Sequence, residues 1–458
     1  MIDVKLIREN PDLVRKAARD KGLAVDIDRL LEVDAQRRAL ETEWNELRHQ
    51  QNLAGQRIAK ATPAEKATLS QEMSAIKVRL KELDARREQV DAELRELLML
   101  VPQIPDPAAP VGHDPSANVE VRRWGSPRSK SDFGFPFKDH VEIGETLGII
   151  DIDRGVKIAG SRNYVLRGAG ALLHEAVLRL AWDLMIEREH EPPPLAAPAG
   201  QRADQASATR PADDRTRGKL RFMPLTVPPL VSDRLMYGTG FFPLHRDEVY
   251  LCERDGQSLV GTAEVPVTGY HADEILEETE LPKLYVARTT CFRREAGAAG
   301  KDTRGLYRIH TFDKLEQVVV CRADPAESAY WHEVIIRNAE AVLQALELPY
   351  RVVEVCTGEM GQGKVRMFDI ETWMPSRGAY SETHSASRFH DFQARRLNLR
   401  YRRADTGKPE FCHTLNNTVV ASPRILIPLL ELNQNADGSV TIPRALRPFM
   451  RGLERIEA

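Results

Sequence analysis

The chain has 458 residues, of which 42% are hydrophobic and 29% are charged, and its formal net charge is -3. This chain is longer than a single hydrophobic core usually supports, so we expect a globular protein with two or three compact units. The near-neutral net charge excludes a general electrostatic attraction of the whole protein to nucleic acid or membrane. Any such contact therefore requires a local basic patch.

The start of the chain and its cysteines indicate the compartment. The first ten residues, MIDVKLIREN, contain no apolar signal core, and no segment approaches the roughly 20 apolar residues of a membrane span. The five cysteines are scattered and include no C-x-x-C pair. This spacing argues against a thiolate zinc site and against a disulfide framework. We therefore expect a cytoplasmic protein with free thiols, no membrane contact and no zinc.

Two long runs near the N-terminus, within residues 30–60 and 69–97, have apolar residues at steps of three and four. The turn between them, ATPAE, offers Thr62 as a helix cap and Pro63 for the first helical turn. Heptad spacing on both sides of a short turn predicts an antiparallel coiled-coil hairpin over about 28–100. The pattern is interrupted at Arg37, Gln51 and Arg87.

The charge of this arm is uneven. The half nearest the turn, residues 48–81, has seven basic residues and two acidic ones. The base of the arm, residues 30–47 and 82–99, has five basic and eleven acidic residues. A positive tip on a negative base favours contact of the tip with a polyanion such as nucleic acid. A solvated charged surface, or a rod used for dimerisation, remains an alternative at this point. The basic residues of the tip are Arg48, Arg57, Lys60, Lys66, Lys77, Arg79 and Lys81.

Proline-rich sequence, LLMLVPQIPDPAAPVG, ends the second helix and indicates a linker. We therefore expect an N-terminal domain over residues 1–108 and a second domain over 109–458. Within the latter, the pattern GAGALLHEAVLRLAWDLMIE predicts a helix at about 168–187, and the segment 191–219, rich in Pro, Ala, Asp and Arg, predicts a disordered insertion. From Leu220 onward, strand-like runs alternate with helices and turns, which favours a largely antiparallel α+β domain.

Two strand-like runs flank a loop in the stretch CFRREAGAAGKDTRGLYRIHTFDKLE. Strand alternation places Arg293 and Glu295 on one side of the first run, and Arg308, Phe312 and Glu316 on one side of the second. If the runs pair antiparallel, one face gathers two arginines, an aromatic ring and two carboxylates. Arginine suits phosphate or carboxylate contacts and the ring can stack a base. A nucleotide site and a solvated hairpin face both remain open from spacing alone.

The same stretch resembles motif 2 of class II aminoacyl-tRNA synthetases and, in its details, that of seryl-tRNA synthetases. Four further stretches agree in the family's order. They are FMPLTVPPLVSDRLMYGTGFFP, which resembles motif 1; LVGTAEVPVTGYH, the serine-binding segment; FDIETWMPSRGAYSETHSASRFHDFQARR, the segment ending in D-F-Q-A-R-R; and HTLNNTVVASPRILIPLLELNQNADGSVTIPRALRPFM, motif 3. The arm matches the family's coiled coil, so the resemblance covers nearly all of the chain except 191–219.

The resemblance implies the fold and the reaction. The expected fold is α+β: an N-terminal antiparallel helical arm, then a class II catalytic domain built on a mostly antiparallel sheet flanked by helices. The implied reaction activates L-serine with ATP to seryl-adenylate and pyrophosphate, and then transfers serine to the 3′ end of tRNA(Ser), with tRNA(Sec) as a further candidate. The implied protein is a homodimer through motif 1, where Pro228 and Pro229 lie, and its arm tip contacts tRNA.

Two alternatives belong to other classes. An amino acid:carrier-protein ligase related to class II synthetases activates an amino acid but lacks the long arm. A non-catalytic synthetase-like RNA-binding protein predicts decay of the ATP residues, which are all present here.

For ATP, the resemblance implies a set around motifs 2 and 3. Arg293 is expected at the α-phosphate and the substrate carboxylate, Glu295 at the adenine, and Arg424 at the γ-phosphate and the purine; these three form the expected catalytic set. Mg²⁺ is the implied cofactor, because the hard oxygen donors Glu382 and Ser385 match the family's ligands. The expected ATP contacts are Arg293, Arg294, Glu295, Arg308, Ile309, Phe312, Glu382, Thr383, His384, Ser385 and Arg424.

For L-serine, the resemblance implies that Thr262 and Glu316 bind the ammonium group and that Asn416 and Thr418 read the hydroxyl. A site that hydrogen-bonds the substrate hydroxyl rejects alanine, because its buried polar groups would be left unmatched. The expected serine contacts are Thr262, Ala263, Glu264, Arg293, Glu316, Asn416 and Thr418.

Three local features depart from familiar patterns. Arg294 stands where the family commonly has a small residue, and strand alternation points it off the active face. The stretch ETHSASRF replaces the family's usual E-I-S-S-C-S-N-F, changing His384, Ala386 and Arg388, and we expect this to affect fine geometry rather than activity. The stretch GEMGQGK lacks the phosphate-loop pattern, because Val365 follows the lysine, and is predicted to be a turn.

Overall fold

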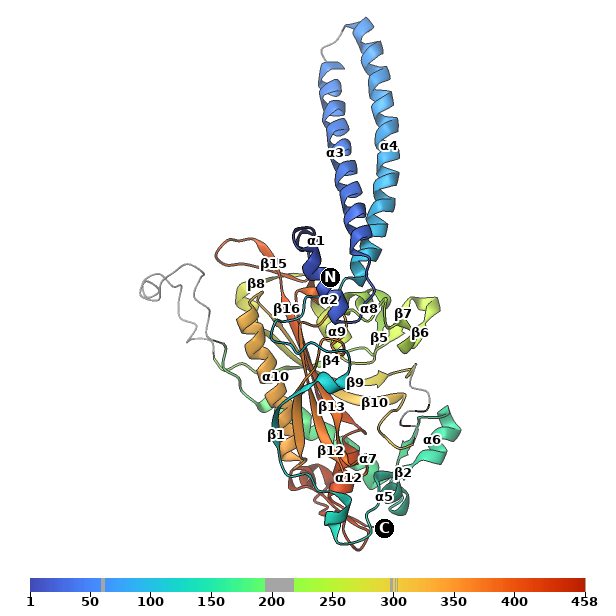
Figure 1. The fold of residues 1–458 in the computed structure, drawn as a ribbon, viewed down its shortest axis with the longest axis vertical. Coiled ribbons are helices and arrows are strands. Elements are labelled where there is room, and N and C mark those ends of the chain that lie inside the picture. Colours follow the sequence, from blue (N-terminus) through green and yellow to red (C-terminus); the bar gives the residue numbers. More distant parts are fainter. Residues whose placement is uncertain (59–61, 194–217, 297–299, 301, 303, 458) are drawn as a thin grey trace, which may run out of the picture. The chain divides into compact units, whose positions relative to one another are not determined.

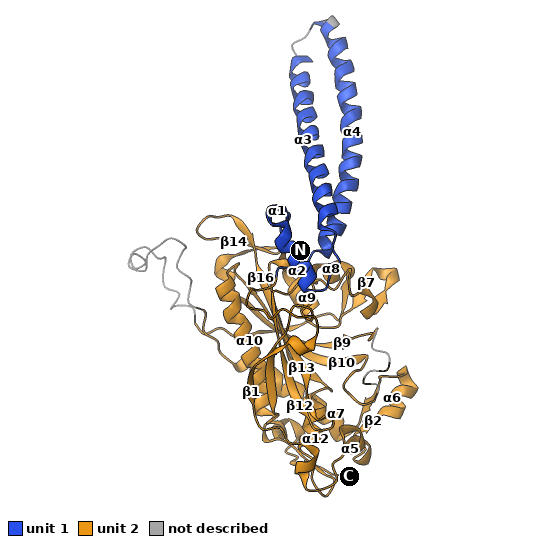
Figure 2. Cartoon of the chain, viewed as in Figure 1, with its two compact units in different colours: residues 1–104 blue, residues 105–458 orange. Residues whose placement is uncertain are grey.

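The computed structural model describes residues 1–58, 62–193, 218–296, 300, 302 and 304–457. The chain divides into two compact units, residues 1–104 and 105–458 (Figure 2). The predicted insertion falls almost wholly outside the described residues, as does Lys60 of the arm tip. Its described flanks meet, because His190 and Leu220 exchange two backbone hydrogen bonds of 2.8 Å.

The first unit contains the predicted helical hairpin. Helices α3 (Ile27–Ile58) and α4 (Pro63–Leu100) run side by side (Figure 1), after the short helices α1 (Val4–Glu9) and α2 (Pro11–Asp20). Thr62 precedes α4, and its backbone N–H donates to the Glu65 carboxylate at 2.8 Å, so the helix begins where the sequence predicts. A buried apolar seam joins the two long helices through Leu30, Val33, Leu40, Leu83, Val90 and Leu94.

Two of the interruptions in the heptad pattern make contacts between the helices. Arg37 Nε lies 3.1 Å from Asp91 Oδ1, and the guanidinium of Arg87 lies 4.8 Å from the ring centroid of Trp44. The Trp44 indole N–H donates to Asp84 at 2.8 Å. Long side chains at these positions cover apolar surface with their stems while their charges find partners, so the seam tolerates them.

The second unit is built on an eight-stranded sheet. Every neighbouring pair is antiparallel except β4 and β9, which confirms the predicted, mostly antiparallel sheet. In spatial order its strands are β1 (Val119–Trp124), β11 (Tyr350–Glu354), β12 (Arg366–Met374), β13 (Ala379–His390), β16 (His413–Ser422), β10 (Thr311–Cys321), β9 (Lys283–Phe292) and β4 (Met223–Thr226).

Smaller elements surround this sheet. The short strands are β2 (Ile150–Asp151), β3 (Val165–Leu166), β5 (Leu230–Ser232), β6 (Leu251–Cys252), β7 (Gln257–Leu259), β8 (Ile275–Glu277), β14 (Arg400–Arg402), β15 (Pro409–Phe411), β17 (Val440–Thr441) and β18 (Arg455–Ile456). The helices are α5 (His140–Thr146), α6 (Ile152–Ala159), α7 (Ala169–Glu187), α8 (Asp233–Thr239), α9 (Glu264–Thr268), α10 (Pro325–Ala345), α11 (Phe392–Leu397) and α12 (Leu426–Leu432).

The main core lies on one face of the sheet. Val177 of α7 and Trp331 of α10 are fully buried and belong to the same apolar cluster as Leu315 and Val319 of β10. Alternation along β10 therefore turns Phe312, Lys314 and Glu316 to the opposite face. The α7 helix lies within one residue of the range that its apolar periodicity predicts. The face opposite α7 and α10 therefore carries these three side chains, together with apolar residues such as Val318.

Two expectations about the environment can be compared with the structure. Among the described residues, no helix combines the length and the apolar character needed to cross a membrane. All five cysteines lie in the described part of the chain, and none of them forms a disulfide. Burial raises the pKa of Cys291 and of Cys412 to about 12, so these thiols stay protonated and unreactive at neutral pH.

Candidate active site

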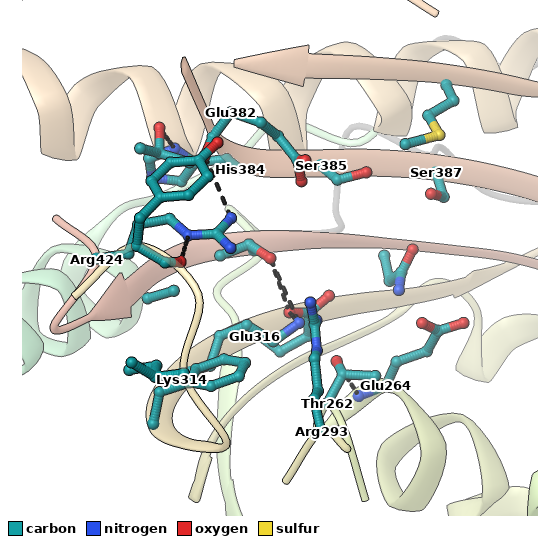
Figure 3. Close-up of a pocket in the computed structure, with 18 of the residues that line it drawn as sticks. Thr262, Glu264, Arg293, Lys314, Glu316, Glu382, His384, Ser385, Ser387 and Arg424 are labelled. Carbon is teal, nitrogen blue, oxygen red and sulfur yellow. Dashed lines mark hydrogen bonds and ion pairs between the residues drawn. The ribbon is translucent and has the colours of Figure 1, made fainter. Parts of the chain in front are cut away.

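A cavity of about 260 Å³ lies against the sheet face that carries Phe312 and Glu316. Strands β10, β13 and β16 supply its floor, and the segment after β9 and the start of α9 supply further walls. In Figure 3, Arg424 and Glu382 lie at one end, and Thr262 and Glu264 lie at the other. The expected site residues that line it are Thr262, Glu264, Arg293, Glu295, Ile309, Phe312, Glu316, Glu382, Thr383, His384, Ser385, Asn416, Thr418 and Arg424.

Three expected residues do not line the cavity. Ala263 is fully buried in an apolar cluster with Val267 and Val318. Arg294 is exposed to solvent. Arg308 pairs instead with Glu295, at 2.7 Å between Nη1 and Oε2. The predicted strand alternation does not extend to Arg293 and Glu295, because β9 ends at Phe292. It does not extend to Arg308 either, because β10 begins only at Thr311.

The cavity also contains residues that sequence reasoning did not include in the site. Lys314 shares the sequence parity of Phe312 and Glu316, so the same alternation could have identified it. Lys364 ends the stretch GEMGQGK, which is a turn as predicted, but no local signal indicates that its last residue reaches the cavity. The additional lining residues are Phe241, Leu306, Tyr307, Lys314, Lys364, Met367, Ser387 and Ala421.

Two arginines give the cavity an anion-binding character. The Arg293 guanidinium lies 5.1 Å from the ring centroid of Phe312, and its Nη2 donates to the Gly261 carbonyl at 3.5 Å. Arg424 donates to the carbonyls of Tyr307 at 3.1 Å and Glu382 at 3.2 Å, and its guanidinium lies 4.5 Å from the Tyr307 ring centroid. Backbone carbonyls and rings orient these side chains without neutralising them, which suits an anion such as a polyphosphate.

The opposite end of the cavity is small and polar. Lys314 Nζ lies 2.5 Å from Glu316 Oε2, and the Thr418 hydroxyl donates to the same carboxylate at 3.3 Å. Asn416 is 6% exposed, and its Oδ1 is buried without a hydrogen-bond partner among the described residues. A buried acceptor without a donor is costly, so this pocket favours a ligand with a hydroxyl or an amine.

Glu264 is a buried carboxylate beside this pocket. Its Oε1 accepts a hydrogen bond from Gln393 Nε2 at 2.7 Å, and the Gln393 carbonyl oxygen accepts one from Thr414 at 2.7 Å. The pKa of Glu264 is raised to about 6, mainly by burial and secondly by the nearby Glu316 carboxylate. The charged form of Glu264 is therefore disfavoured by the fold at neutral pH.

The Glu264→Gln variant is expected to be more stable than the original chain at pH 8, by about 2 kcal/mol at about 1.4 kcal/mol per pKa unit. The folded pKa lies above the unfolded value of 4.5, so this carboxyl contributes stability below about pH 4.5 and loses it as pH rises through about 6. The gain should vanish near pH 4.5, as urea denaturation at both pH values can measure. The exposed Glu253→Gln serves as the control, and equal stabilities of Glu264→Gln and the original chain at pH 8 would contradict the prediction.

The donors expected for Mg²⁺ fit that ion. The Glu382 carboxylate and the Ser385 hydroxyl belong to β13 and line the cavity. Asp369 of β12 pairs with Ser385 in the strand register, and its Oδ1 is buried with no partner in the described part of the chain. Burial, followed by the Glu382 carboxylate, raises the pKa of Asp369 well above its usual range. Oxygen donors beside two crowded carboxylates suit a hard divalent cation.

A second group of potential metal ligands lies on the other face of β10. Donor atoms of His174, Glu175 and Asp313 lie within 4.8 Å of one another. Arg288 already occupies this group, because its Nη2 lies 2.8 Å from Glu175 and 2.9 Å from Asp313. The guanidinium supplies the positive charge that the carboxylates need, so the group is a structural ion-pair network.

The departures in ETHSASRF have structural consequences. Burial lowers the pKa of His384 to about 3, so its ring is neutral, and its Nδ1 lies 2.8 Å from the Thr383 hydroxyl. Ala386 packs in the main core, and the buried Arg388 pairs with Asp106. Neither Ala386 nor Arg388 lines the cavity, whereas Glu382 and Ser385 do. The changed positions therefore adjust the support of β13 more than the cavity surface.

Comparisons with known proteins agree with this geometry. Residues 1–105 match the model of the seryl-tRNA synthetase N-terminal domain, and residues 250–433 match that of the class II tRNA synthetase core domain for G, H, P, S and T. A serine–tRNA ligase of Deinococcus radiodurans is 45% identical, with 99% of this chain and 98% of the relative covered. One of Symbiobacterium thermophilum is 41% identical over all of both chains.

Solved structures agree over the same length. The crystal structure of seryl-tRNA synthetase from Pyrococcus horikoshii complexed with ATP matches with a TM-score of 0.85 and 36% identity, covering 100% of this chain and 99% of that one. The cytoplasmic serine–tRNA ligase of Naegleria fowleri in complex with AMP matches with a TM-score of 0.81 and 29% identity, with the same coverage. The helical arm, the antiparallel sheet and the sequence identity along the whole length lead to one conclusion. The chain belongs to the seryl-tRNA synthetase family of class II aminoacyl-tRNA synthetases.

Proposed function

We propose that the chain is a serine–tRNA ligase. It forms seryl-adenylate and pyrophosphate from L-serine and ATP, and then transfers serine to the 3′ end of tRNA(Ser). The observation that carries this proposal is one cavity in which an anion-binding wall, with Arg293 and Arg424, adjoins a small polar pocket around Glu316 and Asn416. The full-length similarity to serine–tRNA ligases supports it.

In this proposal ATP lies along the wall between the two arginines. Arg293 contacts the α-phosphate and the serine carboxylate, and it stabilises the negative charge that grows on the α-phosphorus as the carboxylate attacks. Phe312 stacks on the adenine, the Glu295 carboxylate accepts a hydrogen bond from the adenine amino group, and Arg424 holds the γ-phosphate. Arg308 reaches the triphosphate once its pair with Glu295 opens. No protein nucleophile is needed, because positioning and charge stabilisation carry the step.

L-Serine binds in the polar pocket. Its ammonium group contacts Glu316 and Thr262, with Glu264 beside them, and its hydroxyl donates to the unpartnered Oδ1 of Asn416. Thr418 reads the same hydroxyl. Alanine has no hydroxyl and leaves the Asn416 amide oxygen without a donor, and the small polar pocket leaves no room for the extra methyl group of threonine. Selectivity for serine therefore follows from this acceptor and from the size of the pocket.

Mg²⁺ is the proposed cofactor, held by Glu382 and Ser385. When bound, the ion would supply positive charge that offsets the negative charge of the ATP phosphates. The role of the chain itself is to hold these oxygen donors on β13 opposite Phe312 and Arg293, so that the phosphates and the adenine are oriented together.

The partners of the protein are proposals as well. Residues 1–108 form the tRNA-binding domain, and its arm tip supplies exposed cations: Arg48, Arg57, Lys66, Lys77, Arg79 and Lys81 are all on the surface. A homodimer forms through motif 1 with Pro228 and Pro229, tRNA(Sec) is a second substrate candidate, and the cytoplasm is the proposed location.

The test is serine-dependent ATP–pyrophosphate exchange, followed by charging of tRNA(Ser) with labelled serine. Both activities are expected, and exchange with alanine or threonine should be lower by about 10²-fold or more. Pyrophosphate exchange followed by transfer of serine to a protein thiol, rather than to tRNA, would indicate a carrier-protein ligase. Failure of exchange at saturating serine, ATP and Mg²⁺ would reject catalysis altogether. Charging of tRNA(Sec) in the same assay decides whether it is a substrate.

A further inference from the structure

Lys314 is a buried ammonium group in the small polar pocket, without a role in the function described so far. Its side chain lines the cavity with Glu316 and Thr418, and the residue is 5% exposed. It lies between Phe312 and Glu316 on the same side of β10, so alternation along the strand directs its side chain into the cavity. A buried lysine is costly unless a carboxylate compensates it, which raises the question of what this charge does.

Glu316 is the compensating group. Lys314 Nζ lies 2.5 Å from Glu316 Oε2 and donates to the Thr418 hydroxyl at 3.4 Å. Glu316 is 1% exposed, so this ion pair is shielded from water. The same carboxylate is the proposed site of the serine ammonium. Two cations, one from the chain and one from the substrate, therefore share a single buried carboxylate in the bound state.

A free amino acid resolves this conflict because it is a zwitterion. With its ammonium group at Glu316, its carboxylate can contact Lys314, and the four charges then alternate in sign. An amine without the carboxylate brings only a second positive charge beside Lys314, and the like charges repel in a poorly solvated pocket.

We propose that Lys314 recognises the α-carboxylate of the amino acid, together with Arg293, and restricts the pocket to zwitterionic substrates. This inference rests on the proposed function and deepens it by naming a specificity residue of the same site. Lys314 forms no covalent bond and exchanges no proton in the reaction. When a carboxylate oxygen bonds to the α-phosphorus and pyrophosphate leaves, the substrate loses its carboxylate charge, so the contact with Lys314 belongs to the free amino acid and weakens in the adenylate.

The test compares serine with serinamide, which has the ammonium and the hydroxyl but no carboxylate. The readouts are the KM of serine in pyrophosphate exchange and the inhibition constant of serinamide against serine. In Lys314→Met the KM of serine should rise by about 30-fold or more, because one partner of a buried charge pair is removed. Serinamide should bind as well as before or better, so the ratio of its inhibition constant to the KM of serine should fall by at least about 30-fold. Lys314→Arg, which keeps the charge, should preserve most of the ratio.

Several controls separate this role from a structural one. The KM of ATP should stay within about twofold, and Lys283→Met, at the far end of the neighbouring strand β9, serves as the matched control. If Lys314→Met does not fold, Lys314→Met in the Glu316→Gln background leaves no unpaired charge, and the same ratio is compared with Glu316→Gln alone. An equal loss for serine and serinamide would overturn the inference. Absence of serine-dependent exchange by the original chain would instead reject the proposed function.

Discussion

Arg293→Ala is expected to lower the kcat/KM of serine-dependent pyrophosphate exchange by about 10²–10³-fold without unfolding the protein. Arg293 is the cation that lines the cavity between Phe312 and the polar pocket. In the proposed reaction its loss removes positive charge from the place where negative charge grows on the α-phosphate. Within the described residues its only side-chain hydrogen bond is a 3.5 Å contact to the Gly261 carbonyl, so little stability depends on it. Circular dichroism and thermal melting beside the exchange assay check both parts.

Adjacent arginines provide a sharp comparison for this prediction. Arg294 follows Arg293 directly and is exposed rather than part of the cavity wall, so Arg294→Ala should show a loss at least about tenfold smaller. The exposed Arg254→Ala tests for a nonspecific effect of removing positive charge. Equal losses for Arg293→Ala and Arg294→Ala would mean that the assignment of the two side chains is wrong.

Shortening the arm should separate the two half-reactions. Replacing residues 41–87 by a short Gly-Ser turn is expected to leave pyrophosphate exchange within about twofold and to reduce charging of tRNA(Ser) by about 10²-fold or more. The cut keeps Leu40, Val90 and the Arg37–Asp91 pair, so the remaining helices retain a buried seam. The cavity lies wholly within residues 105–458, so the chemistry of adenylate formation should be unaffected.

Smaller changes at the tip show whether charge is the cause. Lys66→Gln with Lys77→Gln should raise the KM of tRNA and flatten its dependence on salt, because fewer counterions are released. Glu72→Gln, an exposed change of opposite sign at the same level of the arm, is the matched control. Full charging activity in the shortened chain would refute the role of the arm in tRNA binding.

Much of the architecture follows from short-range patterns. The heptads of residues 30–97, the cap at Thr62 and the alternation through Phe312, Lys314 and Glu316 each depend on a few neighbouring residues. The structure confirms the hairpin and the mostly antiparallel sheet. The five ordered motifs indicated the family, and the comparisons confirm it. Helical and strand periods are properties of the backbone itself, so they can be recognised without knowledge of the partner elements.

The sequence by itself therefore determined the family, the two kinds of architecture and most residues of the cavity. Only the tertiary structure decided that the Lys364 side chain lines the cavity, that Arg308 pairs with Glu295, and that Lys314 pairs with Glu316. Loop residues follow no period, so their direction depends on what packs against them. The partner of a charge depends on which groups burial brings within a few ångströms, and that is a property of the whole fold.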